Sequence, residues 1–150
     1  MKHKISEAER QRRQRKYTNM LIILAIMIVV SLVSCLHQNH VVGFDWTENS
    51  MRVTDPGGAS STIVYEDITA LELEERPNFG TCIDGGQTSS WLYGDWENEV
   101  WGQYTLCAST APNLCIVIHT AGHVYVLSYE SDEITSALYD SIHQLWMNTQ

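Results

Sequence analysis

Residues 114–147 read LCIVIHTAGHVYVLSYESDEITSALYDSIHQLWM and change their hydrophobic period once. The first part is continuously apolar over residues 116–118, as in a strand that is buried on both faces. Residues 120–122, TAG, predict a tight hairpin into a second strand over residues 123–129. From Ser131, an expected N-cap, apolar residues repeat at helical spacing to the end of the segment. The segment therefore predicts a β-hairpin followed by a terminal amphipathic helix.

The preceding part of the domain is divided into short β-rich runs by turn sequences, and this spacing is typical of a sandwich or barrel. One run, residues 67–75, alternates leucine and glutamate, which describes a strand with one face in water. The terminal helix has an apolar stripe to bury, and the open end of a barrel offers a surface for it. We therefore expect a mainly β domain, a partly open barrel of about seven antiparallel strands capped by one C-terminal α-helix. The β-rich runs are residues 41–46, 51–54, 62–65, 67–75, 91–96, 100–106, 114–119 and 123–129.

Residues 81–90, TCIDGGQTSS, are polar and rich in glycine, and we expect a loop there. The Gly85-Gly86 pair does not indicate a phosphate-binding loop, because the GxxxxGK[ST] pattern is absent and no lysine follows Lys16. This connection therefore carries no ligand motif.

Several segments resemble bacterial pleckstrin-homology (PH) domains. They are IVYEDITALEL (63–73), WLYG (91–94), GQYTL (102–106), IVIHTAGHVYVL (116–127) and EITSALY (133–139). The resemblance covers about residues 40–146, and its motifs are hairpin and helix patterns without a catalytic residue. It implies two nearly orthogonal antiparallel sheets closed at one end by the C-terminal helix. It implies no activity, because this fold is a scaffold that hosts many functions.

The same resemblance raises the question of lipid binding. Eukaryotic PH domains often bind inositol phospholipids through lysine and arginine side chains of a strand-connecting loop. This chain departs from that pattern, since its domain holds no lysine and only two arginines, Arg52 and Arg76. We therefore expect no phosphoinositide binding.

Charge is distributed very unevenly along the chain, whose net charge is −9. Residues 1–19 hold seven basic and two acidic residues, whereas residues 36–150 hold two basic and sixteen acidic residues. A domain this acidic is repelled by phosphates and lacks the basic patch that attracts anionic lipids. Nucleic acid is therefore not an expected partner.

Between these two parts, residues 17–36 read YTNMLIILAIMIVVSLVSCL and predict one transmembrane helix. At ~1.5 Å per residue this segment spans about 30 Å, the thickness of the hydrocarbon layer. Basic residues beside a membrane segment stay in the cytoplasm, and five of them lie within residues 10–16. We expect a single-pass protein of the bacterial cell membrane, with its N-terminus cytoplasmic and its C-terminal domain extracytoplasmic. Its expected parts are a basic flank (1–16), the helix (17–36), a linker (37–40), the PH-like domain (41–147) and a tail (148–150).

An alternative for the apolar segment is a cleaved signal sequence. Leu32-Val33-Ser34-Cys35 resembles a bacterial lipobox, in which Cys35 is lipidated and becomes the new N-terminus. The strictly apolar part is also short enough for a signal-peptide core of ~7–15 residues. Both alternatives place the same domain outside the cytoplasm and attach it to the membrane.

Three cysteines lie in the domain. Cys107 and Cys115 fall on consecutive expected strands and form the best candidate disulfide for an exported domain. The alternative is that both are small buried hydrophobic residues. Cys82 is left without a partner in either case.

No arrangement of residues predicts an enzyme, a metal site or a cofactor. Asp95, Glu97 and Glu99 lie near tryptophans, as in a carbohydrate-hydrolase cleft, but a hairpin with acids outward and tryptophans inward explains them more simply. His119 and His123 flank the expected hairpin turn and are expected to form a polar cross-strand pair. GxSxG, HExxH and CxxC patterns are absent.

The expected function is therefore a non-enzymatic, membrane-anchored module that binds or assembles with another protein. Peptide addition to an exposed sheet edge, or docking beside the terminal helix, are the expected modes. The alternative is a surface lipoprotein that binds a small ligand or cation through its acidic face.

Overall fold

The computed structural model describes residues 18, 20, 22, 23, 27, 28 and 42–150. The chain divides into two units, residues 1–38 and residues 39–150. Of the expected membrane helix, only six residues are described, and all six are helical. Among the described residues, no helix is both long enough and apolar enough to cross a membrane. The basic flank, the linker and Cys35 lie outside the described residues.

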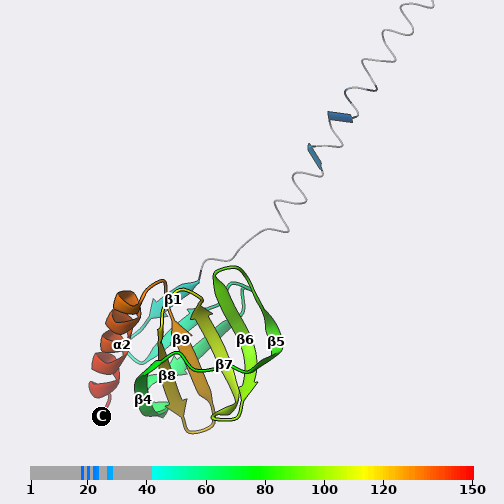
Figure 1. The fold of residues 1–150 in the computed structure, drawn as a ribbon. Coiled ribbons are helices and arrows are strands. Elements are labelled where there is room, and N and C mark those ends of the chain that lie inside the picture. The colour runs from blue at the N-terminus through cyan, green and yellow to red at the C-terminus, as the bar shows by residue number, and fades with distance from the viewer. Residues whose placement is uncertain (1–17, 19, 21, 24–26, 29–41) are drawn as a thin grey trace, which may run out of the picture. The chain divides into compact units, whose positions relative to one another are not determined.

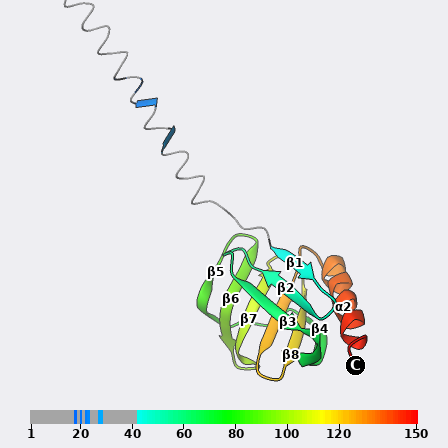
Figure 2. The same ribbon diagram turned by 180° about the vertical axis from the view of Figure 1, so that it is seen from behind.

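The second unit is mainly β and consists of two sheets and one C-terminal helix (Figures 1 and 2). The smaller sheet has three strands in the order β1-β2-β3, and the larger has six in the order β4-β8-β9-β7-β6-β5. The elements are β1 (Gly43–Trp46), β2 (Ser50–Thr54), β3 (Ser60–Val64), the 3-10 turn η1 (Tyr65–Asp67), β4 (Ile68–Glu75), β5 (Thr81–Gln87), β6 (Trp91–Asn98), β7 (Gly102–Ser109), β8 (Leu114–Thr120), β9 (Val124–Ser128) and α2 (Asp132–Met147).

The six-stranded sheet is curved rather than flat, since residues 76–80 alone join its two outer strands. Edge strands of a flat six-stranded sheet would lie about 24 Å apart. The linking residues reach at most about 20 Å when fully extended. In Figure 1 this connection crosses in front of the central strands as it runs from β4 to β5. Phe79 in the connection is buried against the sheet, and its carbonyl accepts a hydrogen bond of 2.5 Å from the Tyr104 hydroxyl.

Both faces of the large sheet are buried, each in its own apolar cluster. The first cluster joins the three-stranded sheet and α2 to one face, and its buried members include Met51, Ile63, Tyr65, Cys107, Ile116, Ile118, Leu127 and Ile142. The second cluster lies on the opposite face beneath the connection, with Phe79, Leu92, Trp96, Tyr104, Leu106, Ala108, Cys115, Val117 and Val126. Successive residues of β8 alternate between the two clusters, as the period of a strand requires.

The segment 114–147 folds as its sequence predicts. Residues 115–118 have no exposed surface, which confirms a strand buried on both faces. β8 and β9 form an antiparallel hairpin, and α2 follows over Asp132–Met147. Ser131 is the N-cap, and its hydroxyl accepts a hydrogen bond of 3.3 Å from the Ile134 N–H. The carboxylate of Asp132 also accepts hydrogen bonds from the Asn113 and Leu114 N–H groups, which ties the start of the helix to the start of β8.

Three expectations about the strands were wrong. The domain has nine strands rather than about seven. Residues 81–87 form strand β5 instead of the expected loop, because their backbone pairs with β6. The sheet is not entirely antiparallel, since β7 and β9 pair in parallel. The reason is topological: the chain leaves β7, passes over one strand position to form β8, and then returns as β9 to fill the position between them.

Strand β5 depends on two glycines that oppose each other across the β5–β6 pair. Gly85 and Gly94 are register partners, and both have positive φ, 127° and 97°. A Cβ on Gly94 would lie 2.2 Å from the Asp84 carbonyl oxygen. The two backbones therefore approach more closely here than any other residue type would permit.

Candidate functional site

An apolar groove of about 360 Å³ runs between β1 and α2. We call it the β1–α2 groove, and it is lined by Val42, Phe44, Trp46, Tyr129, Ile134, Ala137, Leu138 and Ser141. Two of these side chains are substantially open to solvent: Trp46 is 40% exposed and Ile134 is 43% exposed. An isolated exposed apolar side chain is ordinary on a protein surface, but a contiguous apolar groove is typical of a binding site.

The groove follows from two different periodicities in the sequence. Along β1, alternate residues face the same side, so Val42, Phe44 and Trp46 line one wall. Along α2, residues three and four positions apart share a face, and these supply Ile134 and Leu138 to the other wall. A strand and a helix thus present apolar rows to the same space, and neither row is fully covered by the rest of the domain.

Tyr129 closes the floor of the groove and connects it to the core. Its ring packs edge-on against Phe44 and is tilted against Trp91, with ring centroids 5.5 Å apart in both pairs. Its backbone is held by Thr135, whose hydroxyl accepts from the Tyr129 N–H and donates to the Tyr129 carbonyl, both at 3.0 Å. The floor is therefore fixed before any ligand arrives.

Exposed acidic residues lie close in sequence to the residues that line the β1–α2 groove. Asp45 lies on β1 between two lining residues, and Glu48 follows in the hairpin. Glu130, Glu133 and Asp140 lie on or just before α2, and all five acids are exposed. The elements that form the apolar groove therefore also carry several exposed acids.

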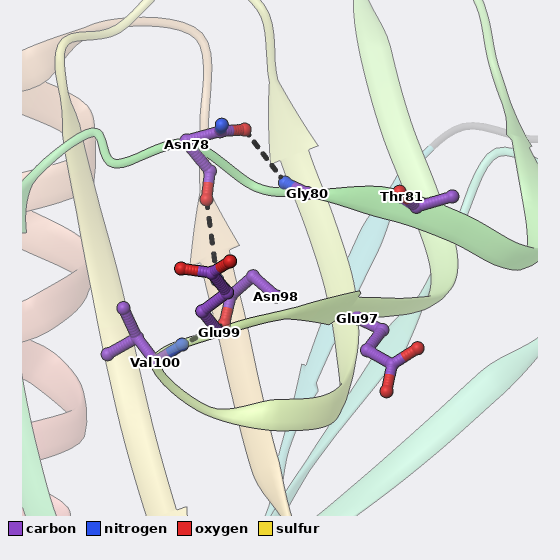
Figure 3. Close-up of a pocket in the computed structure, with 7 residues that line it drawn as sticks. All are labelled: Asn78, Gly80, Thr81, Glu97, Asn98, Glu99 and Val100. Carbon is purple, nitrogen blue, oxygen red and sulfur yellow. Dashed lines mark hydrogen bonds between the residues drawn. The ribbon is translucent and has the colours of Figure 1, made fainter.

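A second pocket, of about 630 Å³, lies where the connection before β5 meets the β6–β7 turn (Figure 3). It is lined by Asn78, Gly80, Thr81, Glu97, Asn98, Glu99 and Val100. Hydrogen bonds to Asn98 hold the turn, since its amide oxygen accepts from the Val100 and Trp101 N–H groups. In Figure 3 the carboxylates of Glu97 and Glu99 point away from each other. The pocket is polar and open, and its two acids do not converge on a common point.

A third pocket, of about 380 Å³, lies between the β2–β3 turn and β6 and is lined in part by Asp55, Asp84 and Asp95. Thr105 donates a hydrogen bond of 3.1 Å to Asp95, and its oxygen lies 2.8 Å from Nε2 of His123. The Thr105 hydroxyl thus links Asp95 on β6 to His123 beside the β8–β9 turn.

The expected disulfide between Cys107 and Cys115 is not formed in this structure, where both thiols are free. Strand β9 lies between β7 and β8, and the two cysteines belong to the clusters on opposite faces of the sheet. Burial raises the pKa of Cys107 to about 12, and burial with the nearby Glu74 carboxylate raises the pKa of Cys115 to about 11. Both therefore behave as buried hydrophobic residues, whereas Cys82 is free and exposed on β5.

The two histidines beside the β8–β9 turn do not form the expected cross-strand pair. His119 opposes Val124, so His119 and His123 fall on opposite faces of the hairpin. His119 lies 4.0 Å from the Glu72 carboxylate, while the ring of His123 packs edge-on against Tyr125. Burial, followed by its hydrogen bond to Glu72, raises the pKa of Glu74 beside this pair.

The acids and tryptophans grouped by the sequence are likewise dispersed. Trp96 is buried and donates a hydrogen bond of 3.1 Å to the Tyr93 carbonyl. Trp101 packs edge-on against Tyr104, and Trp91 packs against the floor of the β1–α2 groove. The acids beside them line two different pockets, and no tryptophan lines either one.

Within the part of the chain that the structure describes, no three histidine, cysteine, aspartate or glutamate side chains are grouped closely enough to hold a metal ion. The groove between β1 and α2 was not predicted as such, because it depends on the placement of β1 beside a helix about ninety residues later in the chain. A signal that could have indicated it is the alternation of Val42, Phe44 and Trp46 with other residues over residues 42–46. No protein-family model, curated protein or solved structure matches the chain.

Proposed function

We propose that the chain is a membrane-anchored protein-interaction module, and that the β1–α2 groove is where its partner docks. The observation that supports this most strongly is the groove itself, with Trp46 and Ile134 exposed on its two walls. Extended peptides and helices both bind in apolar grooves of this kind. The pocket beside the β6–β7 turn and the pocket beside Asp84 and Asp95 bring no catalytic groups together, so a binding role is proposed rather than an enzymatic one.

The proposal includes a PH-like fold and an extracytoplasmic location. A mainly β domain with one C-terminal helix packed against its sheets agrees with the resemblance in residues 63–73 and 116–139. The parallel pairing of β7 and β9 departs from the all-antiparallel sheets that the resemblance implies. Anchoring through residues 17–36, with the basic flank in the cytoplasm, rests on the hydropathy and charge of the sequence.

The test is co-purification of the partner with the full chain from detergent-solubilised membranes, using one variant in the groove and one outside it. Ile134→Glu places a charge on the groove wall at a position that is already exposed, so the fold is retained. Val100→Glu is the matched control, because Val100 is 75% exposed in the β6–β7 turn and does not line the groove.

A partner that is retained at constant stoichiometry by the wild type and by Val100→Glu, and lost from Ile134→Glu, supports the proposal. A partner that Ile134→Glu retains at wild-type stoichiometry contradicts it. Circular dichroism of both variants verifies that neither substitution alters the secondary structure.

A second candidate is a surface lipoprotein, lipidated at Cys35, that binds a small ligand or cation. It is favoured by the open polar pocket that contains Glu97 and Glu99. The mass of the mature chain distinguishes the two anchors, since lipidation at Cys35 removes residues 1–34. A rise in melting temperature with micromolar calcium or magnesium that is lost in Glu97→Gln would support cation binding in this pocket.

A further inference from the structure

We infer that the partner contributes an extended segment with alternating apolar and basic side chains, which pairs as an additional strand with the outer edge of β1. This inference rests on the proposed function and specifies the partner of the same groove. It follows from three features of β1: its free edge, the direction of its side chains and the charge around it.

The outer edge of β1 is available for pairing. Within the described part of the chain, β1 pairs with β2 alone and ends its sheet. The Thr47 N–H donates to the Ser50 carbonyl at 2.9 Å, so this pair is a hydrogen-bonded one. Hydrogen-bonded pairs alternate along antiparallel strands, which makes Asp45–Arg52 the next such pair. The N–H and C=O groups of Phe44 and Trp46 therefore point outward, where an added strand would meet them.

The same two residues also line the groove with their side chains. Residues that oppose each other on paired strands point to the same face of the sheet. Partner residues opposite Phe44 and Trp46 therefore enter the groove and face α2, and these positions favour apolar side chains. The partner residue between them lies opposite Asp45 and faces the other side of the sheet. A single added strand would therefore hydrogen bond to the outward N–H and C=O groups of β1 and also fill the apolar groove with its side chains.

Charge complementarity determines the residue between the apolar positions. Asp45 is exposed on β1, and its partner on β2 is Arg52, the only basic side chain within β1–β3. The intervening partner residue lies directly opposite Asp45 on the added strand. An opposite charge directly across a strand pair stabilises it, and a like charge destabilises it. Lysine or arginine in the intervening positions is therefore favoured, and an acidic segment is rejected.

The test uses the full chain in detergent micelles and a synthetic octapeptide of alternating valine and lysine. Amide hydrogen exchange is measured by NMR, together with the chemical shifts of groove residues. Strand addition is expected to slow exchange at the outward-facing N–H groups of Phe44 and Trp46 about tenfold or more, because each becomes hydrogen bonded. Exchange at Asp45 is expected to change little, since its N–H already faces β2.

Two control peptides test separately the charge of the partner and its backbone hydrogen bonds to β1. A valine–glutamate octapeptide tests charge and is expected to bind at least about tenfold more weakly, because its glutamate would lie opposite Asp45. A valine–lysine peptide with alternate amides N-methylated keeps the side chains but removes hydrogen bonds, and it is expected not to bind.

Failure of the inference is distinguishable from failure of the proposed function. Shifts in groove residues without protection of Phe44 and Trp46 overturn strand addition, as does absence of valine–lysine binding, while the co-purification with Ile134→Glu still decides the docking role. Equal binding of the glutamate peptide overturns the basic character of the partner. Protection of both amides by the lysine peptide alone supports the inference.

Discussion

Thr135 and Tyr129 form a reciprocal pair in which one buried hydroxyl satisfies both backbone groups of one residue. The Tyr129 N–H donates to Oγ1 of Thr135, and the same hydroxyl donates to the Tyr129 carbonyl, each at 3.0 Å. Thr135 is completely buried on α2, and Tyr129 follows the last strand. The pair fixes the start of the helix against the end of β9, and it sets the floor of the β1–α2 groove.

Thr135→Val is therefore expected to destabilise the domain by about 1–2 kcal/mol, because it leaves the Tyr129 N–H without its acceptor and leaves the Tyr129 carbonyl with the Ser131 N–H as its remaining donor. Valine keeps the shape of threonine, so packing changes little. Guanidinium denaturation of the full chain, followed by tryptophan fluorescence, measures the loss. Ser141→Ala is the control, since the Ser141 hydroxyl is exposed and bonds within its own helix. A Thr135→Val midpoint equal to that of Ser141→Ala would contradict the role assigned to this pair.

Tyr104 and Tyr65 offer a matched comparison, because both are completely buried and only one hydroxyl has a partner. The Tyr104 hydroxyl donates to the Phe79 carbonyl, while the Tyr65 hydroxyl has no hydrogen-bond partner in the described structure. Tyr104→Phe is expected to cost about 1–3 kcal/mol, since the buried carbonyl loses its donor. Tyr65→Phe is expected to be neutral or stabilising. Chemical denaturation of both variants measures the difference, and the reverse order would refute the assignment.

The cysteines are expected to differ sharply in reactivity. Cys82 is exposed, while Cys107 and Cys115 are buried with raised pKa values, and the thiolate is the reactive form. Iodoacetamide at pH 8 should alkylate Cys82 in the native chain, and Cys107 and Cys115 only after denaturation. Peptide mapping by mass spectrometry measures the alkylation of each cysteine separately. A peptide containing a Cys107–Cys115 bridge in non-reduced protein would show that the sheet order described above is wrong.

The free energy of unfolding is expected to fall in alkaline solution. The thiol pKa rises from 9.0 in the unfolded chain to about 12 for Cys107 and about 11 for Cys115 on folding. The unfolded state therefore loses these protons first, so the stabilisation is complete below pH 9 and is lost progressively as the pH rises above it. Cys107→Ala combined with Cys115→Ala should flatten the fall between pH 9 and pH 11. An equally steep fall in that double variant would exclude the thiols as its cause.

Gly94 and Gly122 are expected to respond oppositely to alanine. A Cβ at Gly94 would meet the Asp84 carbonyl at 2.2 Å, and its φ of 97° is unfavourable for other residues. Gly94→Ala should therefore destabilise the domain by at least about 2 kcal/mol. A Cβ at Gly122 meets nothing within 4 Å. Gly122→Ala should change stability by less than about 0.5 kcal/mol. Thermal denaturation of the two variants makes the comparison, and equal melting temperatures would contradict the close β5–β6 approach.

Prediction from sequence succeeded where a local pattern and the tertiary environment agree. The helix over Asp132–Met147 was predicted from its N-cap and its apolar spacing. Burial of β8 on both faces was predicted from three consecutive apolar residues. The resemblance to PH domains, the membrane segment and the partner remain predictions.

Strand β5 could not be predicted in this way, because its residues are mostly exposed and show no apolar alternation. It exists because Gly85 and Gly94 let two backbones approach, and that pairing is visible only when both strands are placed. The distance between the two candidate disulfide cysteines was also hidden from the sequence. Short sequence separation placed Cys107 near Cys115, but the sheet order inserts β9 between their strands.

The amino-acid sequence alone determined the local elements: a hairpin, a capped helix, and an acidic β domain that follows a basic, apolar N-terminal segment. Only the tertiary structure decided which elements became neighbours, including the parallel β7–β9 pair and the groove between β1 and α2. The physical reason is the range of the interactions. Caps and hydrophobic periods act over a few residues and can be read directly, whereas strand order results from burial of both sheet faces by segments that are distant in the chain.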